Sequence, residues 1–179
     1  MGYNRKKREK EPNMLDSFII DGGIPLRGEV TPSGNKNAAL PLICATLMSD
    51  EPVILHNMPL IRDILEMEKL MLSLGVTIEK LTPHSWKFQA DQLSINDLDP
   101  ALCKNVRASI LLAGPLVNRV GSFVLPPPGG DVIGRRRVDT HLLALNKLGV
   151  NAYYDRQYHF EVKGRLKGTD ILMDEASVT

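Results

Sequence analysis

The sequence repeats its own pattern at a spacing of 70 residues, and this repeat restricts the possible folds more than any other feature. Asn37–Leu42 (NAALPL) resembles Arg107–Leu112 (RASILL), and Glu51–Leu55 (EPVIL) resembles Gly121–Leu125 (GSFVL), each 70 positions later. In both copies the apolar pattern indicates a helix, a strand, a loop, a second helix that ends at a glycine, and a further strand. A duplicated α/β unit is the simplest explanation of this order.

The second copy is four residues longer than the first, and the extra length falls where a loop is rich in proline, glycine and arginine. Leu74–Val76 recurs as Leu148–Val150, which is 74 positions later. The loop reads PPPGGDVIGRRRVDTH over Pro126–His141. Its glycines let the backbone approach a ligand closely, and the guanidinium groups of Arg135–Arg137 match the oxygens of phosphates or carboxylates. We interpret this loop as an anion site, with a solvated basic surface loop as the alternative.

A second candidate for anion binding is the turn at Ser33–Asn37, which leads into an apolar helical run at Ala38–Met48. The backbone amides at the N-terminus of a helix favour an anion, and Lys36 adds a full positive charge. The alternative is an ordinary Asn or Ser cap beside an exposed lysine. The segment before this turn, Ser17–Val30, predicts two short strands in a hairpin.

The overall charge is nearly balanced, which excludes a general preference of the whole chain for nucleic acid or anionic membranes. The 179 residues include 22 basic and 21 acidic side chains, for a net charge of +1. Any electrostatic preference must therefore be local. The apolar runs are shorter than the roughly 20 residues that a membrane helix needs, so we expect a soluble protein. The first 13 residues are basic without the apolar core of a secretory signal, and we expect a solvated tail there.

Two cysteines, Cys44 and Cys103, lie in or beside apolar segments and show no spacing typical of a metal site. We expect both thiols to be buried and reduced, which fits a cytoplasmic protein. Met58, Met67 and Met71 are expected to fill the core rather than to form a site.

Three motifs in this order resemble the UDP-N-acetylglucosamine 1-carboxyvinyltransferase family of enolpyruvyl transferases. They are Ser33–Leu40, Arg107–Ile110 and Gly129–His141, and the similarity extends from about Asp16 to Thr179. The resemblance implies an α/β fold, the inside-out α/β barrel of this family, in which three repeated βαβαββ units form each of two lobes. This chain would then hold two of the three units of one lobe.

The domain limits implied by this resemblance and by the repeat are as follows. We expect a disordered basic tail at residues 1–16, strands that belong to or cross from the other lobe at 17–35, and a partial substrate-binding lobe at 36–179. Within that lobe, we expect repeat one at about 36–100, repeat two at about 101–175 and the start of repeat three at 176–179.

The reaction that the resemblance implies transfers the enolpyruvyl group of phosphoenolpyruvate to the 3-hydroxyl of UDP-N-acetylglucosamine and releases phosphate. This is the first committed step of peptidoglycan synthesis, and hence of cell wall biogenesis, cell shape and cell division. The family uses these two small molecules and no cofactor or metal. By position, Lys36, Asn37 and Arg136 match the residues that bind phosphoenolpyruvate. Those that bind UDP-N-acetylglucosamine are matched by Arg107, Arg136, Arg137, Val138, Asp139, Thr140, His141, Glu175, Ala176, Ser177 and Val178.

One catalytic position departs from the usual family pattern. Asp131 stands where the family usually has a loop cysteine, and Arg137 stands where proline is more familiar. A carboxylic acid can donate a proton as a thiol does, so Asp131 is the expected general acid if its pKa is raised when substrate binds. Family members with aspartate at this position resemble enzymes insensitive to fosfomycin, whose epoxide alkylates the thiolate.

The resemblance also implies that some of the machinery lies beyond Thr179. In this family the base for the sugar hydroxyl and further arginines for phosphoenolpyruvate follow in the C-terminal part, so we expect residues 1–179 alone to be inactive. The alternative is a non-catalytic module that binds a nucleotide sugar or another anion on the same fold. RNA binding through Arg5–Lys10 and Arg135–Arg137 is a weaker alternative, because the chain lacks the aromatic platforms that such modules use.

Overall fold

A computed structural model describes residues 19–23, 25–95, 98–129 and 138–173. The chain divides into two compact units, Met1–Thr31 and Pro32–Thr179. In the first unit, the described residues form neither helix nor strand, so the predicted hairpin within Ser17–Val30 is wrong for this chain. Leu26 is 98% exposed there. The described residues do not form the predicted hairpin because an isolated two-stranded hairpin with no apolar surface to cover is at best marginally stable. The predicted tail at 1–16 lies outside the described residues.

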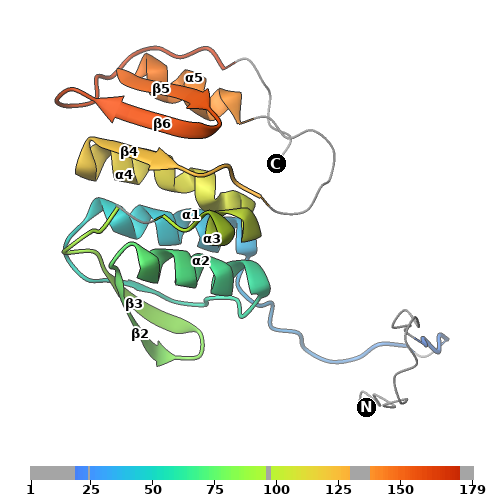
Figure 1. Cartoon of the computed structure of the whole chain (residues 1–179). Helices are drawn as coiled ribbons and strands as arrows, with labels where there is room; N and C mark the ends of the chain where they lie inside the picture. Colours follow the sequence, from blue (N-terminus) through green and yellow to red (C-terminus); the bar gives the residue numbers. More distant parts are fainter. Residues whose placement is uncertain (1–18, 24, 96–97, 130–137, 174–179) are drawn as a thin grey trace. The chain divides into compact units, whose positions relative to one another are not determined.

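The second unit contains the two predicted copies of one α/β arrangement (Figure 1). The elements of the first copy are α1 (Lys36–Ala45), the 3-10 helix η1 (Thr46–Met48), β1 (Val53–Leu55), α2 (Arg62–Ser73), β2 (Thr77–Thr82) and β3 (Ser85–Gln89). Those of the second are α3 (Pro100–Asn105), the 3-10 helix η2 (Arg107–Leu112), α4 (Ala113–Val120), β4 (Ser122–Leu125), α5 (Asp139–Lys147), β5 (Val150–Asp155) and β6 (Gln157–Val162).

The strand order confirms the repeat. Each copy forms a three-stranded sheet in which the last strand lies between the other two and is antiparallel to both, in the orders β1-β3-β2 and β4-β6-β5. Phe88 of β3 pairs with Val53 and Ile78, and Phe160 of β6 occupies the corresponding place in the second sheet. In chain order, the first and second strands of each sheet run parallel to one another. The connection between them is a helical crossover, which is α2 between β1 and β2 and α5 between β4 and β5.

Each sheet buries one face. Trp86 and Phe88 on β3 are fully buried, whereas Ile54, next to them in register but on the opposite face, is 46% exposed. In the second sheet, Phe123 and Phe160 stack with ring centroids 4.9 Å apart on the buried face. This alternation is the period-2 pattern expected of a sheet that is solvated on one side.

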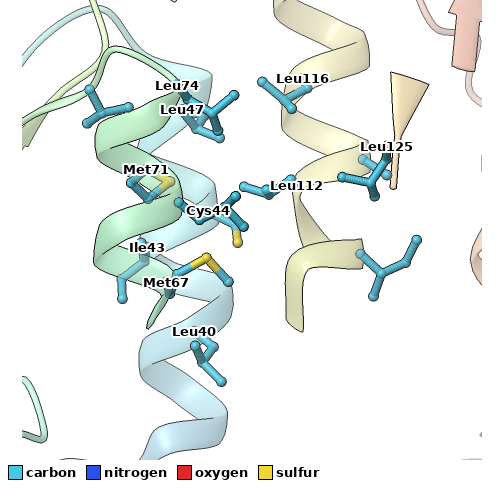
Figure 2. Close-up of a cluster of buried hydrophobic side chains, with 14 of the residues drawn as sticks. Leu40, Ile43, Cys44, Leu47, Met67, Met71, Leu74, Leu112, Leu116 and Leu125 are labelled. Atoms are coloured by element: carbon cyan, nitrogen blue, oxygen red, sulfur yellow. The ribbon is translucent and has the colours of Figure 1, made fainter. Parts of the chain in front are cut away.

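The buried faces pack on a helical layer to which both copies contribute. Helix α1 contacts α2 and η2, and α4 contacts η1 as well as β4 and β6. Figure 2 shows α1 and α2 side by side, with Leu112 and Leu116 directed toward them. In Figure 1, α1 and α2 lie between the sheet of β2 and β3 and the sheet of β4, β5 and β6, whereas α5 lies at the far end beside β5. The inside-out barrel that the resemblance implies stays a prediction.

Both cysteines are free and buried, as predicted. Burial raises the pKa of Cys44 to about 12 and that of Cys103 to about 11. Both thiols therefore stay protonated and unreactive at neutral pH. Met58, Met67 and Met71 are fully buried core residues, also as predicted.

One arginine connects the two copies through backbone groups. The guanidinium of Arg119, in the last turn of α4, donates from Nη1 to the carbonyl of Leu47 at 2.9 Å and from Nη2 to the carbonyl of Ala90 at 2.8 Å. Leu47 belongs to η1, and Ala90 follows β3. The Arg119 side chain therefore provides hydrogen-bond donors for two backbone carbonyls of the first copy, one in η1 and one just after β3.

A close crossing of backbone segments occurs at the same place in each copy. A Cβ atom on Gly34 would lie 1.8 Å from the carbonyl oxygen of Asn57, and one on Gly129 would lie 1.8 Å from that of Lys104. In the first copy, the segment before α1 crosses the segment after β1. In the second copy, the end of α3, which leads into η2, crosses the segment after β4. A glycine permits the approach in both copies. The glycine lies on the first segment in one copy and on the second segment in the other.

Gly34→Ala is expected to destabilise the protein by roughly 1–3 kcal/mol, because the new methyl group must push backbone rather than a flexible side chain. The measurement is the free energy of unfolding in urea. Gly168→Ala is the matched control, because position 168 is exposed and no atom beyond its chain neighbours lies within 4 Å of the place that its methyl group would occupy. It should change the free energy of unfolding by no more than about 0.5 kcal/mol. Equal effects of the two substitutions would contradict the crossing.

Candidate functional site

The structure describes part of the predicted site. Lys36, Asn37, Arg107 and residues 138–141 are described. The others lie outside the described residues, and their predicted roles stay predictions: Asp131, Arg136, Arg137, Glu175, Ala176, Ser177 and Val178.

Lys36 and Asn37 form the start of α1, where the sequence left two interpretations open. Asn35 is the N-cap, and its side-chain oxygen accepts a hydrogen bond from the backbone N–H of Asn37 at 2.7 Å. The Nζ atom of Lys36 lies 2.8 Å from Oδ2 of Asp63 on α2. The described geometry is thus a capped helix with a paired lysine, closer to the plain-cap alternative than to an open cradle of amides.

The Lys36–Asp63 pair leaves the lysine exchangeable. The two side chains are 49% and 38% exposed, and ion pairs as exposed as this contribute roughly 0–1 kcal/mol. A phosphate group with two negative charges can therefore compete with one carboxylate for the ammonium group. Asp63 was not predicted as a site residue, since nothing in the pattern of α2 distinguishes it from an ordinary acidic residue in the first turn of a helix.

Arg107, Asp139 and His141 lie in one electrostatic neighbourhood, although 34 positions separate the first and last in sequence. Burial lowers the pKa of His141, and the positive charge of Arg107 lowers it further. Arg107 starts η2, whereas Asp139 and His141 are in the first turn of α5. The structure thus brings together three residues that the resemblance assigns to the nucleotide sugar. A neutral His141 can both donate and accept a hydrogen bond.

Tyr158 belongs to the same neighbourhood and was not predicted from the sequence. Burial raises the pKa of its hydroxyl, Tyr154 and Asp139 raise it further, and Arg107 opposes the rise. Its ring lies 4.8 Å from that of Tyr154 across the β5–β6 hairpin. In the sequence, Tyr158 could be recognised only as an alternating strand residue, because its proximity to Arg107 depends on the packing of β6.

The loop that carries the predicted general acid leaves the described fold at Gly129. The backbone N–H of Gly129 donates to the carbonyl of Cys103 at 3.1 Å, and the same carbonyl accepts from the hydroxyl of Ser109 at 3.3 Å. The start of the loop is therefore bound to the end of α3, next in sequence to the segment that begins with Arg107.

Two surface hollows lie apart from the predicted site residues. One of about 640 Å³ is lined mainly by apolar residues around Leu98, Phe123 and Pro126, and one of about 320 Å³ lies beside Lys163, Arg165 and Lys167. Within the described ranges, no three His, Cys, Asp or Glu side chains gather as metal ligands would, and no helix is long and apolar enough to span a membrane.

The proximity of Arg107 to His141 is testable by titration. Arg107→Met is expected to raise the pKa of His141, because a positive charge that disfavours the imidazolium is removed. NMR of the imidazole Cε1–H resonance against pH measures this. Lys104→Met, which removes a neighbouring positive charge that does not act on His141, is the control and should leave the titration unchanged. An unchanged pKa in Arg107→Met would show that the two side chains are not neighbours.

Comparison with known proteins gives the following relatives. The family model for EPSP synthase (3-phosphoshikimate 1-carboxyvinyltransferase) matches residues 20–179. A UDP-N-acetylglucosamine 1-carboxyvinyltransferase of Treponema denticola is 48% identical over 165 residues, which are 92% of this chain and 38% of the relative. One of Bacteroides fragilis is 41% identical over 171 residues, which are 92% of this chain and 39% of the relative. The chain thus spans about two fifths of the length of these relatives.

A solved structure supports the fold. The enolpyruvyl transferase NikO from Streptomyces tendae aligns with a TM-score of 0.65 at 21% sequence identity, covering 81% of this chain and 32% of that one. The enolpyruvyl transferase fold expected from the sequence is thereby confirmed. The match of the family model over residues 20–179 shows that this chain belongs to the EPSP synthase family.

Proposed function

We propose that this chain is the N-terminal part of a UDP-N-acetylglucosamine 1-carboxyvinyltransferase. The complete enzyme would transfer the enolpyruvyl group of phosphoenolpyruvate to the sugar 3-hydroxyl and release phosphate. The single observation that best supports this is the proximity of Arg107, at the start of η2, to Asp139 and His141 in the first turn of α5. The names of relatives that are 41–48% identical agree with it.

The described residues suit the substrates by charge. The reaction forms a bond between the sugar oxygen and the enol carbon and breaks the bond from that carbon to the phosphate oxygen, so cations must hold the phosphate and the carboxylate. Lys36 would exchange Asp63 for the phosphate, with Asn37 and Arg136 beside it. Arg107, Asp139 and His141 would hold UDP-N-acetylglucosamine together with Arg136, Arg137, Val138, Thr140 and residues 175–178.

Asp131 would be the general acid that protonates the methylene carbon of the enol as the sugar oxygen adds to the neighbouring carbon. The methyl group formed in this way loses a proton again when phosphate leaves, which restores the methylene of the enolpyruvyl product. An ordinary aspartate is ionised at neutral pH, so closure of the site around substrate must raise its pKa by removing water. The neighbouring arginines act in the opposite direction, since positive charge favours the carboxylate. The proposal therefore requires that desolvation outweighs the arginines when both substrates are bound.

The rest of the enzyme would complete the active site. The base for the sugar hydroxyl would come from the C-terminal part, which is the proposed partner of this chain, and residues 1–179 alone would not turn over. The domain limits expected from the repeat and the resemblance belong to the same proposal. The proposed place of action is the cytoplasm, in the synthesis of peptidoglycan for the cell wall.

Asp131→Ala in the complete enzyme is expected to slow phosphate release by roughly 10²–10⁴-fold, the usual contribution of a general acid. The measurement is release of phosphate from phosphoenolpyruvate that depends on UDP-N-acetylglucosamine. Asp131→Cys should keep most of the activity, because a thiol also donates a proton. If the unsubstituted complete enzyme binds the nucleotide sugar and never releases phosphate, the non-catalytic binding module is the correct alternative.

Fosfomycin is expected to leave the unsubstituted enzyme active, because its epoxide reacts with a thiolate and the loop offers a carboxylate. Mass spectrometry should find no drug adduct. Cys44 and Cys103 serve as internal controls, since both are buried with raised pKa values and should not react. Asp131→Cys should gain one adduct and lose activity. A drug adduct at Asp131, or inhibition of the unsubstituted enzyme, would contradict this prediction.

A further inference from the structure

Glu66 on α2 is the only buried charged residue in the part of the chain that the structure describes. It is 8% exposed, and both of its carboxylate oxygens accept hydrogen bonds. Oε1 accepts from Nζ of Lys69 at 2.8 Å, and Oε2 accepts from Nδ2 of Asn105 at 2.9 Å. The bond from Lys69 and then that from Asn105 lower the pKa of this carboxyl, so Glu66 is ionised at neutral pH.

A buried carboxylate is a poor way to stabilise a core. Removing a charge from water costs free energy that its partners offset only in part, and a well-packed apolar residue often serves stability equally well. Lys69 lies one turn away on the same helix, and its side chain is largely exposed to water. The bond to Lys69 therefore does not explain why a carboxylate is buried at position 66. Asn105 is different, because it connects α2 of the first copy to the end of α3 in the second.

Asn105 lies at a junction that leads directly to Arg107. It is the last residue of α3, and Val106, buried and extended at φ −138° and ψ 121°, separates it from Arg107 at the start of η2. The carbonyl of Cys103 in the same turn accepts from Gly129 and from Ser109. The turn is thus attached to the loop segment on one side and to α2 on the other.

We propose that Glu66 is a positioning residue for substrate binding: through Asn105 it fixes the turn from which Arg107 extends toward UDP-N-acetylglucosamine. This inference rests on the proposed function, because it takes Arg107 as a ligand of the nucleotide sugar. Asp63, one turn earlier on α2, pairs with Lys36, but that pair is exposed and exchangeable, so the positioning role is confined to the buried carboxylate of Glu66.

The test measures KM for each substrate separately in the complete enzyme. Asn105→Ala removes the bond to Glu66 at an exposed position and should raise KM for UDP-N-acetylglucosamine by about tenfold or more, since misplacing a binding group is costly. KM for phosphoenolpyruvate should stay within about twofold. Glu66→Gln, which keeps an oxygen for Asn105, should preserve both values. Lys69→Met removes the other partner of Glu66 and is the matched control, with no change in either KM.

A double substitution shows whether the effect passes through Arg107. In an Arg107→Met enzyme, Asn105→Ala should cause no further rise in KM for UDP-N-acetylglucosamine. Unchanged KM values in Asn105→Ala would overturn the inference. So would a parallel rise of both KM values together with a lower melting temperature, because that result indicates a merely structural role. Absence of turnover in the unsubstituted complete enzyme would instead overturn the proposed function, and the inference with it.

Discussion

Burial of two small sheets against one shared layer of helices is the constraint on which the structure depends. Three strands have a single apolar face, and in both sheets that face carries the largest core side chains, Trp86 and Phe88 in one and Phe160 in the other. Contacts of α1 with η2 and of α4 with η1 combine helices of both copies into this layer.

The same sharing of helices produces the site. Because α2 and α3 are in contact, residues of the first copy reach the turn that starts the second. Glu66 contacts Asn105 there, and Gly129 attaches the beginning of the arginine loop to the same turn. The close crossings at Gly34 and Gly129 occur at corresponding places, so a structural feature of the repeat has become, in the second copy, the attachment of the predicted catalytic loop.

Much of this could be predicted from the sequence, and the failures have physical causes. Apart from α3, which the sequence did not predict, the helices and strands between Lys36 and Val162 follow the predicted order, because their apolar spacing matches the period of each element. The strands predicted within Ser17–Val30 failed because a strand needs a partner that local sequence does not reveal. Asp63 and Tyr158 were missed since their importance lies in which distant residue they meet.

Residue type and spacing along the chain were sufficient to predict the repeat and the burial of Cys44 and Cys103, and three motifs carried the resemblance to the family. Three other features became visible only in the folded chain: the pairing of Lys36 with Asp63, the burial of Glu66 against Asn105, and the proximity of Arg107 to His141. The reason is physical. Periodicity is a local property of the backbone, whereas hydrogen bonds and charge pairs form between side chains that packing alone brings within a few ångströms of each other.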